Sequence, residues 1–123
     1  MSRRRAITVT DEAPTLTLKA HQDSGGKTVL QVIGDIDLVS TDYLRTELLS
    51  AVEHGTVVLD LDGVAFCDSS GLRVLLEAAR RAKIYGAAFR LAAPTAPVER
   101  LLDLTRADQV LEVFPDVDSA LNR

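Results

Sequence analysis

The sequence predicts an α/β fold with a partly parallel sheet and a β-hairpin at one end. Short runs rich in Val, Ile and Leu alternate with stretches in which apolar residues recur every three or four positions, so strands should alternate with helices. The first two strand patterns are separated only by a glycine-containing turn, which is typical of a hairpin. The chain has 123 residues, the size of one domain with its own core.

The composition is typical of a soluble globular protein and excludes several functional classes. Apolar residues make up 46% of the chain, but no apolar run approaches the roughly 20 residues that cross a bilayer. The net charge is −4 and the basic residues are scattered apart from a run at residues 3–5, so we expect no nucleic-acid partner. The start of the chain lacks a signal-peptide pattern, and a single cysteine suits a reducing compartment. We therefore expect a cytoplasmic protein with no membrane partner.

The first third of the chain predicts a tail followed by the hairpin. Residues 1–13 mix charged and polar residues and precede a proline, so we expect a flexible N-terminal tail, with a single domain over residues 14–123. Residues 15–20 and residues 28–34 alternate polar and apolar side chains on either side of a turn that contains two glycines. This pattern predicts two antiparallel strands.

A first helix is predicted after the hairpin. Ser40 is a good N-cap residue, and helical spacing of apolar residues continues to about Glu53. Gly55 then ends the pattern. The residues expected to face the core are Leu44, Leu48, Ala51 and Val52.

The chain is organised around a strand, a polar turn and a helix between residues 56 and 85. Residues 56–61 are β-branched and nearly all apolar, as in a strand that is covered on both faces. After the turn, apolar residues recur every three or four positions until near Gly86, which predicts one face of a helix. The turn holds three residues that can bond the free N–H groups of a first helical turn: Asp68, Ser69 and Ser70.

The last third of the chain predicts a strand, a helix and a short edge strand. Residues 89–93 are largely apolar, and Thr95 can cap a helix with apolar residues at helical spacing as far as Thr105. Residues 110–114 are expected to form the edge strand, with a last helical turn or two around residues 117–121.

Asp60 and Asp62 offer an alternative function. Two carboxylates after a strand could hold Mg²⁺, as in the nucleophile loop of haloacid-dehalogenase phosphatases, or Asp60 could accept phosphate as in a response-regulator receiver. Both families need further residues that this sequence does not supply in the expected places, so a solvated strand end is favoured. A serine hydrolase would need a base near Ser69 or Ser70, and neither histidine stands in a catalytic context. We therefore expect no catalytic residue, no metal site and no cofactor.

Cys67 directly precedes the polar turn. A helix N-terminus lowers a thiol pKa, which would suit a redox sensor, whereas the neighbouring Asp68 raises it. A single cysteine at a strand end is more commonly buried packing. Packing is the favoured interpretation, and a redox role stays open.

The two serines have a structural and a regulatory interpretation. A capping serine contributes about 1 kcal/mol, but capping needs one such residue and the turn supplies three in a row. A phosphate on Ser69 would add a charge of about −1.5 to −2 beside the positive end of the helix dipole, which tolerates it. Arg73, four residues on, could pair with this phosphate, and Asp68 would oppose it. Phosphorylation should therefore change binding rather than folding.

These residues resemble the bacterial anti-sigma factor antagonists, which are built on the STAS domain. The resemblance runs from about Thr15 to Leu121 and is strongest at residues 64–72, which look like the phosphorylation loop of that family. Residues 34–37 and 97–102 support it. The fold that the resemblance implies is a mixed sheet of four to five strands with the main helices packed on one side.

By this resemblance, the unphosphorylated protein binds an anti-sigma factor that is a serine/threonine kinase, and binding frees the sigma factor. The kinase then phosphorylates Ser69, with Ser70 as the second choice, and a metal-dependent serine phosphatase resets the cycle. We expect a monomer or weak dimer. The residues expected to lie on the docking surface are Asp37, Asp68, Ser69, Ser70, Gly71, Leu72 and Arg73.

STAS domains also serve as constitutive interaction or scaffold domains in stress-signalling and transport complexes. In that alternative there is no phospho-switch, and Ser69 only caps the helix. The intact residues 68–71 and the lack of a membrane segment favour the free-standing antagonist. Arg73 stands where some members of the family have glycine, so the surface could suit one particular kinase.

Overall fold

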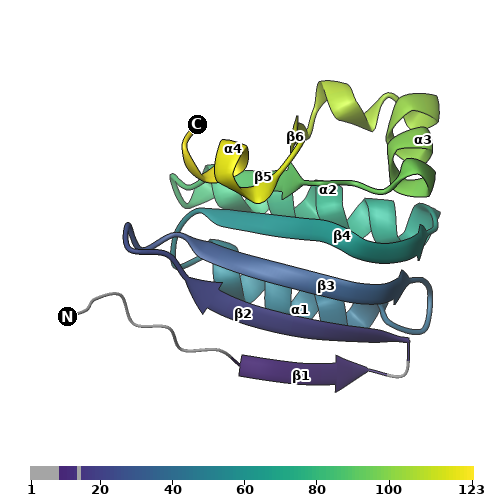
Figure 1. Cartoon of the computed structure of the whole chain (residues 1–123), viewed down its shortest axis with the longest axis horizontal. Helices are drawn as coiled ribbons and strands as arrows, with labels where there is room; N and C mark the ends of the chain where they lie inside the picture. The colour runs from purple at the N-terminus through teal and green to yellow at the C-terminus, as the bar shows by residue number, and fades with distance from the viewer. Residues whose placement is uncertain (1–8, 14) are drawn as a thin grey trace.

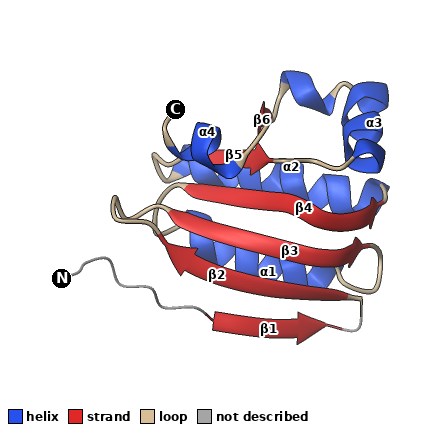
Figure 2. Cartoon of the chain, viewed as in Figure 1, coloured by secondary structure: helices blue, strands red, loops and turns tan. Residues whose placement is uncertain are grey.

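The molecule is built on one mixed sheet with two long helices across one of its faces (Figures 1 and 2). The structure, a computed structural model, describes residues 9–13 and 15–123. In chain order the elements are β1 (Val9–Ala13), β2 (Leu16–Gln22), β3 (Thr28–Ile36), α1 (Thr41–Val52), β4 (Val57–Cys67), α2 (Ser69–Ile84), β5 (Phe89–Ala92), α3 (Ala96–Thr105), the short 3-10 helix η1 (Ala107–Gln109), β6 (Glu112–Phe114) and α4 (Val117–Leu121). The strands lie side by side in the order β1 to β6.

The sheet has an antiparallel half and a parallel half. β1, β2 and β3 pair antiparallel, so the β2–β3 hairpin is as predicted. β3, β4, β5 and β6 pair parallel, and α1, α2 and α3 provide the crossovers between them. The predicted α/β class and mixed sheet are therefore confirmed.

The sheet has six strands rather than four to five. The additional strand is β1, which lies inside the segment predicted to be a flexible tail, whereas residues 1–8 of that segment lie outside the described residues. Its sequence includes Asp11 and Glu12, which weakened the strand pattern. Charged residues are common on edge strands, where they discourage pairing with another chain.

The main core lies between the sheet and the paired helices α1 and α2. Alternate residues of β4 point into it, and Val57, Leu59 and Leu61 are all fully buried. The opposite face of the sheet carries a smaller apolar cluster that is covered by α4. The main helices therefore pack on one side, as the family resemblance implied.

β4 is longer than the pattern predicted. It continues through Asp62 and Gly63 to Cys67, because two register shifts against β3 allow it to keep pairing beyond the apolar run. Its end lies beside the end of β3, since Ile36 pairs with Cys67. Two loops therefore leave the sheet at the same place, one leading into α1 and the other into α2.

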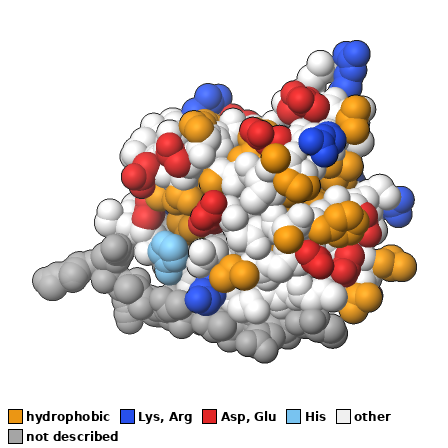
Figure 3. Space-filling model, turned by 45° about the vertical axis from the view of Figure 1, so that its right-hand side comes forward, with side chains coloured by type: hydrophobic (Ala, Val, Ile, Leu, Met, Phe, Trp, Pro, Cys, Tyr) orange, Lys and Arg blue, Asp and Glu red, His pale blue; other side chains and the backbone are white. Residues whose placement is uncertain are grey.

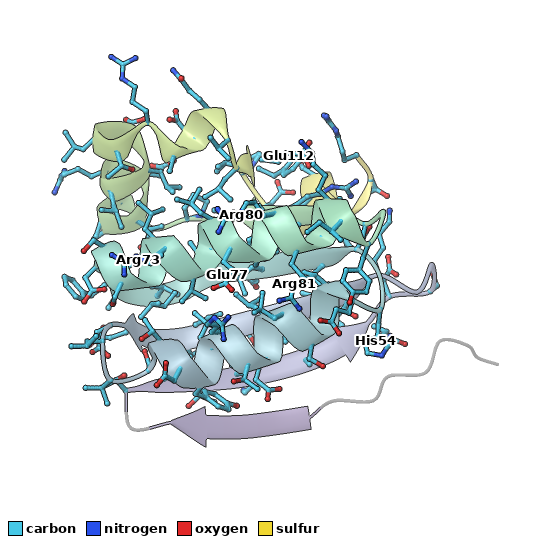
Figure 4. The ribbon with its side chains drawn as sticks, turned by 180° about the vertical axis from the view of Figure 1, so that it is seen from behind. His54, Arg73, Glu77, Arg80, Arg81 and Glu112 are labelled. Carbon is cyan, nitrogen blue, oxygen red and sulfur yellow. The ribbon has the colours of Figure 1, made fainter. Side chains whose placement is uncertain are left out.

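Ion pairs hold α1 and α2 together on the outer side (Figure 4). Arg45 of α1 makes a bidentate contact with Glu77 of α2, with both N–O distances 2.7 Å. Nearer the other end, Arg81 of α2 pairs with Glu53, which directly follows α1. Both helices begin at the edge of the sheet where β3 and β4 end, and these ion pairs hold them side by side.

Candidate functional site

The candidate site lies where β3 and β4 end. The backbone N–H of Asp68 donates to the carbonyl oxygen of Ile36 at 3.1 Å, which ties the start of α2 to the end of β3. The N–H of Leu38, in the loop before α1, donates to the Asp68 carboxylate. In parallel sheets, ligands and partners commonly meet the protein at the carboxyl ends of the strands.

Asp68 is the N-cap of α2. Its Oδ1 accepts hydrogen bonds from the N–H of Ser70 at 3.0 Å and from the N–H of Gly71 at 3.1 Å. The hydroxyl of Ser70 donates to the same oxygen at 2.5 Å. These bonds satisfy N–H groups that the first helical turn leaves free.

The same contacts set the charge state of Asp68. Partial burial of the carboxylate alone would raise its pKa. The hydrogen bonds from the Ser70 hydroxyl and from the N–H groups of Gly71, Ser70 and Leu38 together outweigh burial and hold the pKa of Asp68 below its ordinary value. Asp68 is therefore an anion at neutral pH.

The two serines of the turn have different environments. The Ser70 hydroxyl is half-buried and bonded to Asp68. Ser69 is the first residue of α2, is exposed, and its hydroxyl makes no hydrogen bond within the described part of the chain. Ser69 is therefore the more accessible of the two serines.

Arg73 is exposed one helical turn after Ser69, whereas the two residues between the serines and Arg73 face inward. Gly71 is buried, and Leu72 is only 7% exposed and belongs to the main core. The prediction that Gly71 and Leu72 lie on the docking surface therefore needs correction: they pack the start of α2 onto the sheet. Asp68, Ser69, Ser70 and Arg73 remain at or near the surface.

Asp37 builds the neighbouring loop. Its carboxylate accepts hydrogen bonds from the Thr15 hydroxyl and the N–H of Val39, both at 3.1 Å, and from the N–H of Ser40 at 3.2 Å. With these bonds the Asp37 side chain supports the loop from within. The loop in turn presents Leu38 and Val39 to solvent, 77% and 63% exposed.

Three exposed apolar residues of this site were not predicted from the sequence: Leu38, Val39 and Phe66. Phe66 is 49% exposed although it stands in an apolar run that was expected to continue the strand. The register explains this, because Gly34 pairs with Val64 and Asp35 with Phe66, so that Ala65 is an extra residue and β4 bulges there. The apolar pair inside an otherwise polar loop was the available sequence signal for Leu38 and Val39.

We define the Ser69 surface as Leu38, Val39, Phe66, Ser69 and Arg73. The side of the molecule at which β3 and β4 end comes forward in Figure 3, which shows hydrophobic side chains beside acidic ones there. Exposed apolar side chains gathered at one place commonly mark a protein-binding surface. The arrangement thus suits docking of a protein over the start of α2.

Cys67 is packed inside this site. It is only 7% exposed, and burial, with a smaller effect of the neighbouring Asp68, raises its pKa to about 12. Its thiol is therefore protonated at neutral pH, which opposes a redox role, because sensor cysteines are exposed thiolates. This agrees with the favoured interpretation of Cys67 as packing.

Asp60 and Asp62 do not stand at the end of a strand as predicted, because β4 continues for five residues beyond Asp62. Asp60 accepts a hydrogen bond from the N–H of Asp62 at 3.1 Å. Among the side chains that the structure describes, those of residues 15–123, no three Asp, Glu, His or Cys residues form a group that could hold a metal ion. Around Asp60 and Asp62, this part of the chain therefore offers no acidic cluster of the kind that either phosphoryl-transfer alternative requires.

Comparison with known families matches residues 17–120 to the STAS domain, and the chain belongs to this family. The resemblance inferred from the sequence is thereby confirmed. An anti-sigma F factor antagonist of Paenibacillus polymyxa is 26% identical over 99 residues, which cover 78% of this chain and 85% of the relative.

Solved structures agree on the fold. An anti-sigma factor antagonist from Mycobacterium paratuberculosis superposes with a TM-score of 0.74 at 24% identity, over 98% of this chain and 95% of that one. The Bacillus cell fate determinant SpoIIAA in its phosphorylated form gives a TM-score of 0.67 at 16% identity, over 86% and 97% of the two chains. Within the described residues, no helix of this chain is long and apolar enough to cross a membrane.

Proposed function

We propose that this protein is an anti-sigma factor antagonist that acts in the cytoplasm. Its unphosphorylated form binds an anti-sigma factor that is also a serine kinase, and binding releases the sigma factor. The kinase transfers the γ-phosphoryl group of ATP to the Oγ of Ser69, whose proton passes to a base of the kinase, and ADP leaves. A metal-dependent phosphatase hydrolyses the phosphoester and restores the binding form. The protein itself is a binding partner and a phosphorylation substrate rather than an enzyme.

The observation that carries this proposal is the free hydroxyl of Ser69. Asp68 caps α2, and Ser70 supports Asp68, so neither task is left for Ser69. The scaffold alternative explains Ser69 as a helix cap, and that explanation no longer applies. The names of the relatives support the antagonist role, and the phosphorylated Bacillus protein supports a switch of this kind.

Phosphorylation would act directly on the docking surface. Leu38 and Val39 are exposed in the loop whose Leu38 N–H bonds Asp68, the residue before Ser69. Phe66 is exposed near the end of β4, three residues before Ser69, and adds to the apolar area. A partner that covers this area would also have to remove water from a phosphate of charge about −1.5 to −2, which is costly without new cationic partners. The phosphorylated protein should therefore leave the kinase.

The test is a binding experiment with the protein as bait in lysate of the native host, with and without ATP. We expect an ATP-binding serine kinase to be retained without ATP and released with it, as the bait gains one phosphate on Ser69. Ser69→Ala should bind the same kinase, gain no phosphate and stay bound in ATP. Phosphorylation of Ser69→Ala at the wild-type rate would instead assign Ser70, and a partner that stays bound to unmodified bait would favour the scaffold.

A matched pair of variants tests the docking surface. Leu38 and Leu104 are equally exposed, at 77%, but Leu104 lies on α3, outside the Ser69 surface. We expect Leu38→Ser to weaken retention of the kinase about tenfold, because apolar residues at the centre of an interface contribute 1 kcal/mol or more. Leu104→Ser should bind like the wild type, and equal losses in both variants would contradict the assigned surface.

A further inference from the structure

Arg73 is an unpaired cation on the exposed side of α2. No hydrogen bond or ion pair joins its side chain to another residue in the part of the chain that the structure describes. Its nearest acidic candidate along the helix is Glu77, four residues on. Glu77 is already held by the bidentate contact with Arg45 of α1 and is not paired with Arg73.

The helix geometry directs Arg73 toward Ser69. Ser69 is the first residue of α2 and Arg73 stands at i+4, so their Cβ atoms are neighbours, about 5–6 Å apart, on one face of the helix. Long side chains on a helix point back toward its N-terminus. Figure 4 shows Arg73 near the start of α2, whereas Glu77 and Arg81 lie on the side of α2 toward α1.

We propose that a phosphate on Ser69 binds the guanidinium of Arg73 one turn along α2. This inference rests on the proposed function, because it takes Ser69 as the phosphorylated residue. A planar guanidinium can give two parallel hydrogen bonds to phosphate oxygens.

The pair gives Arg73 a regulatory task. The Asp68 carboxylate and the phosphate would compete as acceptors for the N–H groups of Ser70 and Gly71, which already donate to Asp68. Arg73 offers the phosphate a separate partner, so Asp68 keeps its cap and the start of α2 stays folded. Phosphorylation also engages the one cation of the Ser69 surface, which a docking partner could otherwise use.

The experiment follows the ionisation of the phosphate itself. Phosphoserine is placed at position 69 during translation through a reassigned codon, so no kinase is needed, and the phosphate is titrated by ³¹P NMR. Arg73 favours the dianion, so Arg73→Gln should raise the second pKa of the phosphate by about 0.3 unit, the size expected for an exposed i,i+4 pair. Arg73→Lys should retain most of the effect, and 1 M salt should reduce it by screening.

Arg80 provides the control, because it is exposed on the same helix two turns further from Ser69. Arg80→Gln should leave the titration unchanged. A second readout is thermal unfolding, in which phosphorylation should lower the Tm of Arg73→Gln by about 2 °C more than that of the wild type.

Identical titrations of the wild type and Arg73→Gln would overturn the pair, and so would an equal shift in Arg80→Gln. A host kinase that ignores Ser69 would refute the proposed function while the titration result stood, so the two failures can be told apart.

Discussion

The two loops at the ends of β3 and β4 use the same residue types for different purposes. In the loop before α1, Asp37 and Ser40 both bond back into the loop, and Ser40 is completely buried. In the turn before α2, Asp68 and Ser70 form the matching polar pair. Next to this pair stands one more serine, Ser69, which is exposed and whose hydroxyl makes no hydrogen bond within the described chain. One Asp and one Ser therefore suffice to build such a loop, and the additional serine is available for function.

The serines should therefore differ in what they contribute to stability. The Ser40 hydroxyl accepts from the N–H of Asp37 at 3.1 Å and donates to the carbonyl of Asp35 at 3.0 Å. Ser40→Ala removes both of these part-buried hydrogen bonds, although the Asp35 carbonyl keeps the hydroxyl of Thr15 as a donor, and we expect the free energy of unfolding to fall by about 2 kcal/mol. Ser69→Ala should change it by less than about 0.5 kcal/mol, as exposed substitutions do.

Urea unfolding measures both values, and Ser70→Ala should lie between them because its hydroxyl is bonded but half-buried. If Ser69→Ala proves as destabilising as Ser40→Ala, then Ser69 has a structural task and the contrast between the loops fails.

The tight packing between the two loops can be tested at Gly71. A Cβ added there would lie 2.5 Å from Cγ2 of Ile36 and 2.8 Å from Sγ of Cys67, so the start of α2 would have to move away from β3. Overpacking costs about 1–3 kcal/mol, and two contacts this short favour the upper part of that range, about 2–3 kcal/mol. The better helix propensity of alanine offsets about 1 kcal/mol of this cost. We therefore expect Gly71→Ala to lose about 1 to 2 kcal/mol in urea unfolding.

Gly25→Ala is the matched control, since the nearest atom to its added Cβ is a side-chain oxygen of Asp23 at an ordinary 3.5 Å. It should unfold like the wild type. An unchanged stability of Gly71→Ala would mean that α2 is not held against β3 as closely as the structure has it.

Local patterns predicted most of the fold. β3 and α2 have strong periods of two and 3.6 residues, β4 begins with a nearly continuous apolar run, and the existence and order of all three are confirmed. β1 was missed because Asp11 and Glu12 interrupt its pattern, and only the free edge of β2 makes a strand of it. Its formation depends on a pairing partner rather than on its own residues.

The site was predicted less completely, because much of it depends on contacts between segments. Ser40 does stand at the N-cap position of α1, but its hydroxyl bonds backward to the end of β3 instead of capping the helix. Phe66 is exposed because of a register shift between two strands, which no pattern within β4 reveals. Ser69 and Ser70 cannot be told apart by residue type, and only the hydrogen bond from the Ser70 hydroxyl to the Asp68 carboxylate distinguishes them.

The last prediction concerns the charge of Asp68. Asp68→Ala removes the N-cap and should lower the free energy of unfolding by about 1 kcal/mol at pH 7. The pKa of Asp68 is held below its ordinary value in the folded protein, so the unfolded chain takes up the proton first as the pH falls. The stability that the wild type gains from the Asp68 carboxylate is fully present above the pKa of Asp68 in the unfolded chain, about 3.9. It is lost as the pH falls through the lower pKa of Asp68 in the folded protein.

Urea unfolding of the wild type and Asp68→Ala between pH 5 and about 2.5 measures this difference in stability. Glu77 and Asp116, whose pKa values are also lowered, are present in both proteins and cancel. A difference that stayed constant over this range would show that the Asp68 side chain stabilises the turn by packing rather than by its carboxylate.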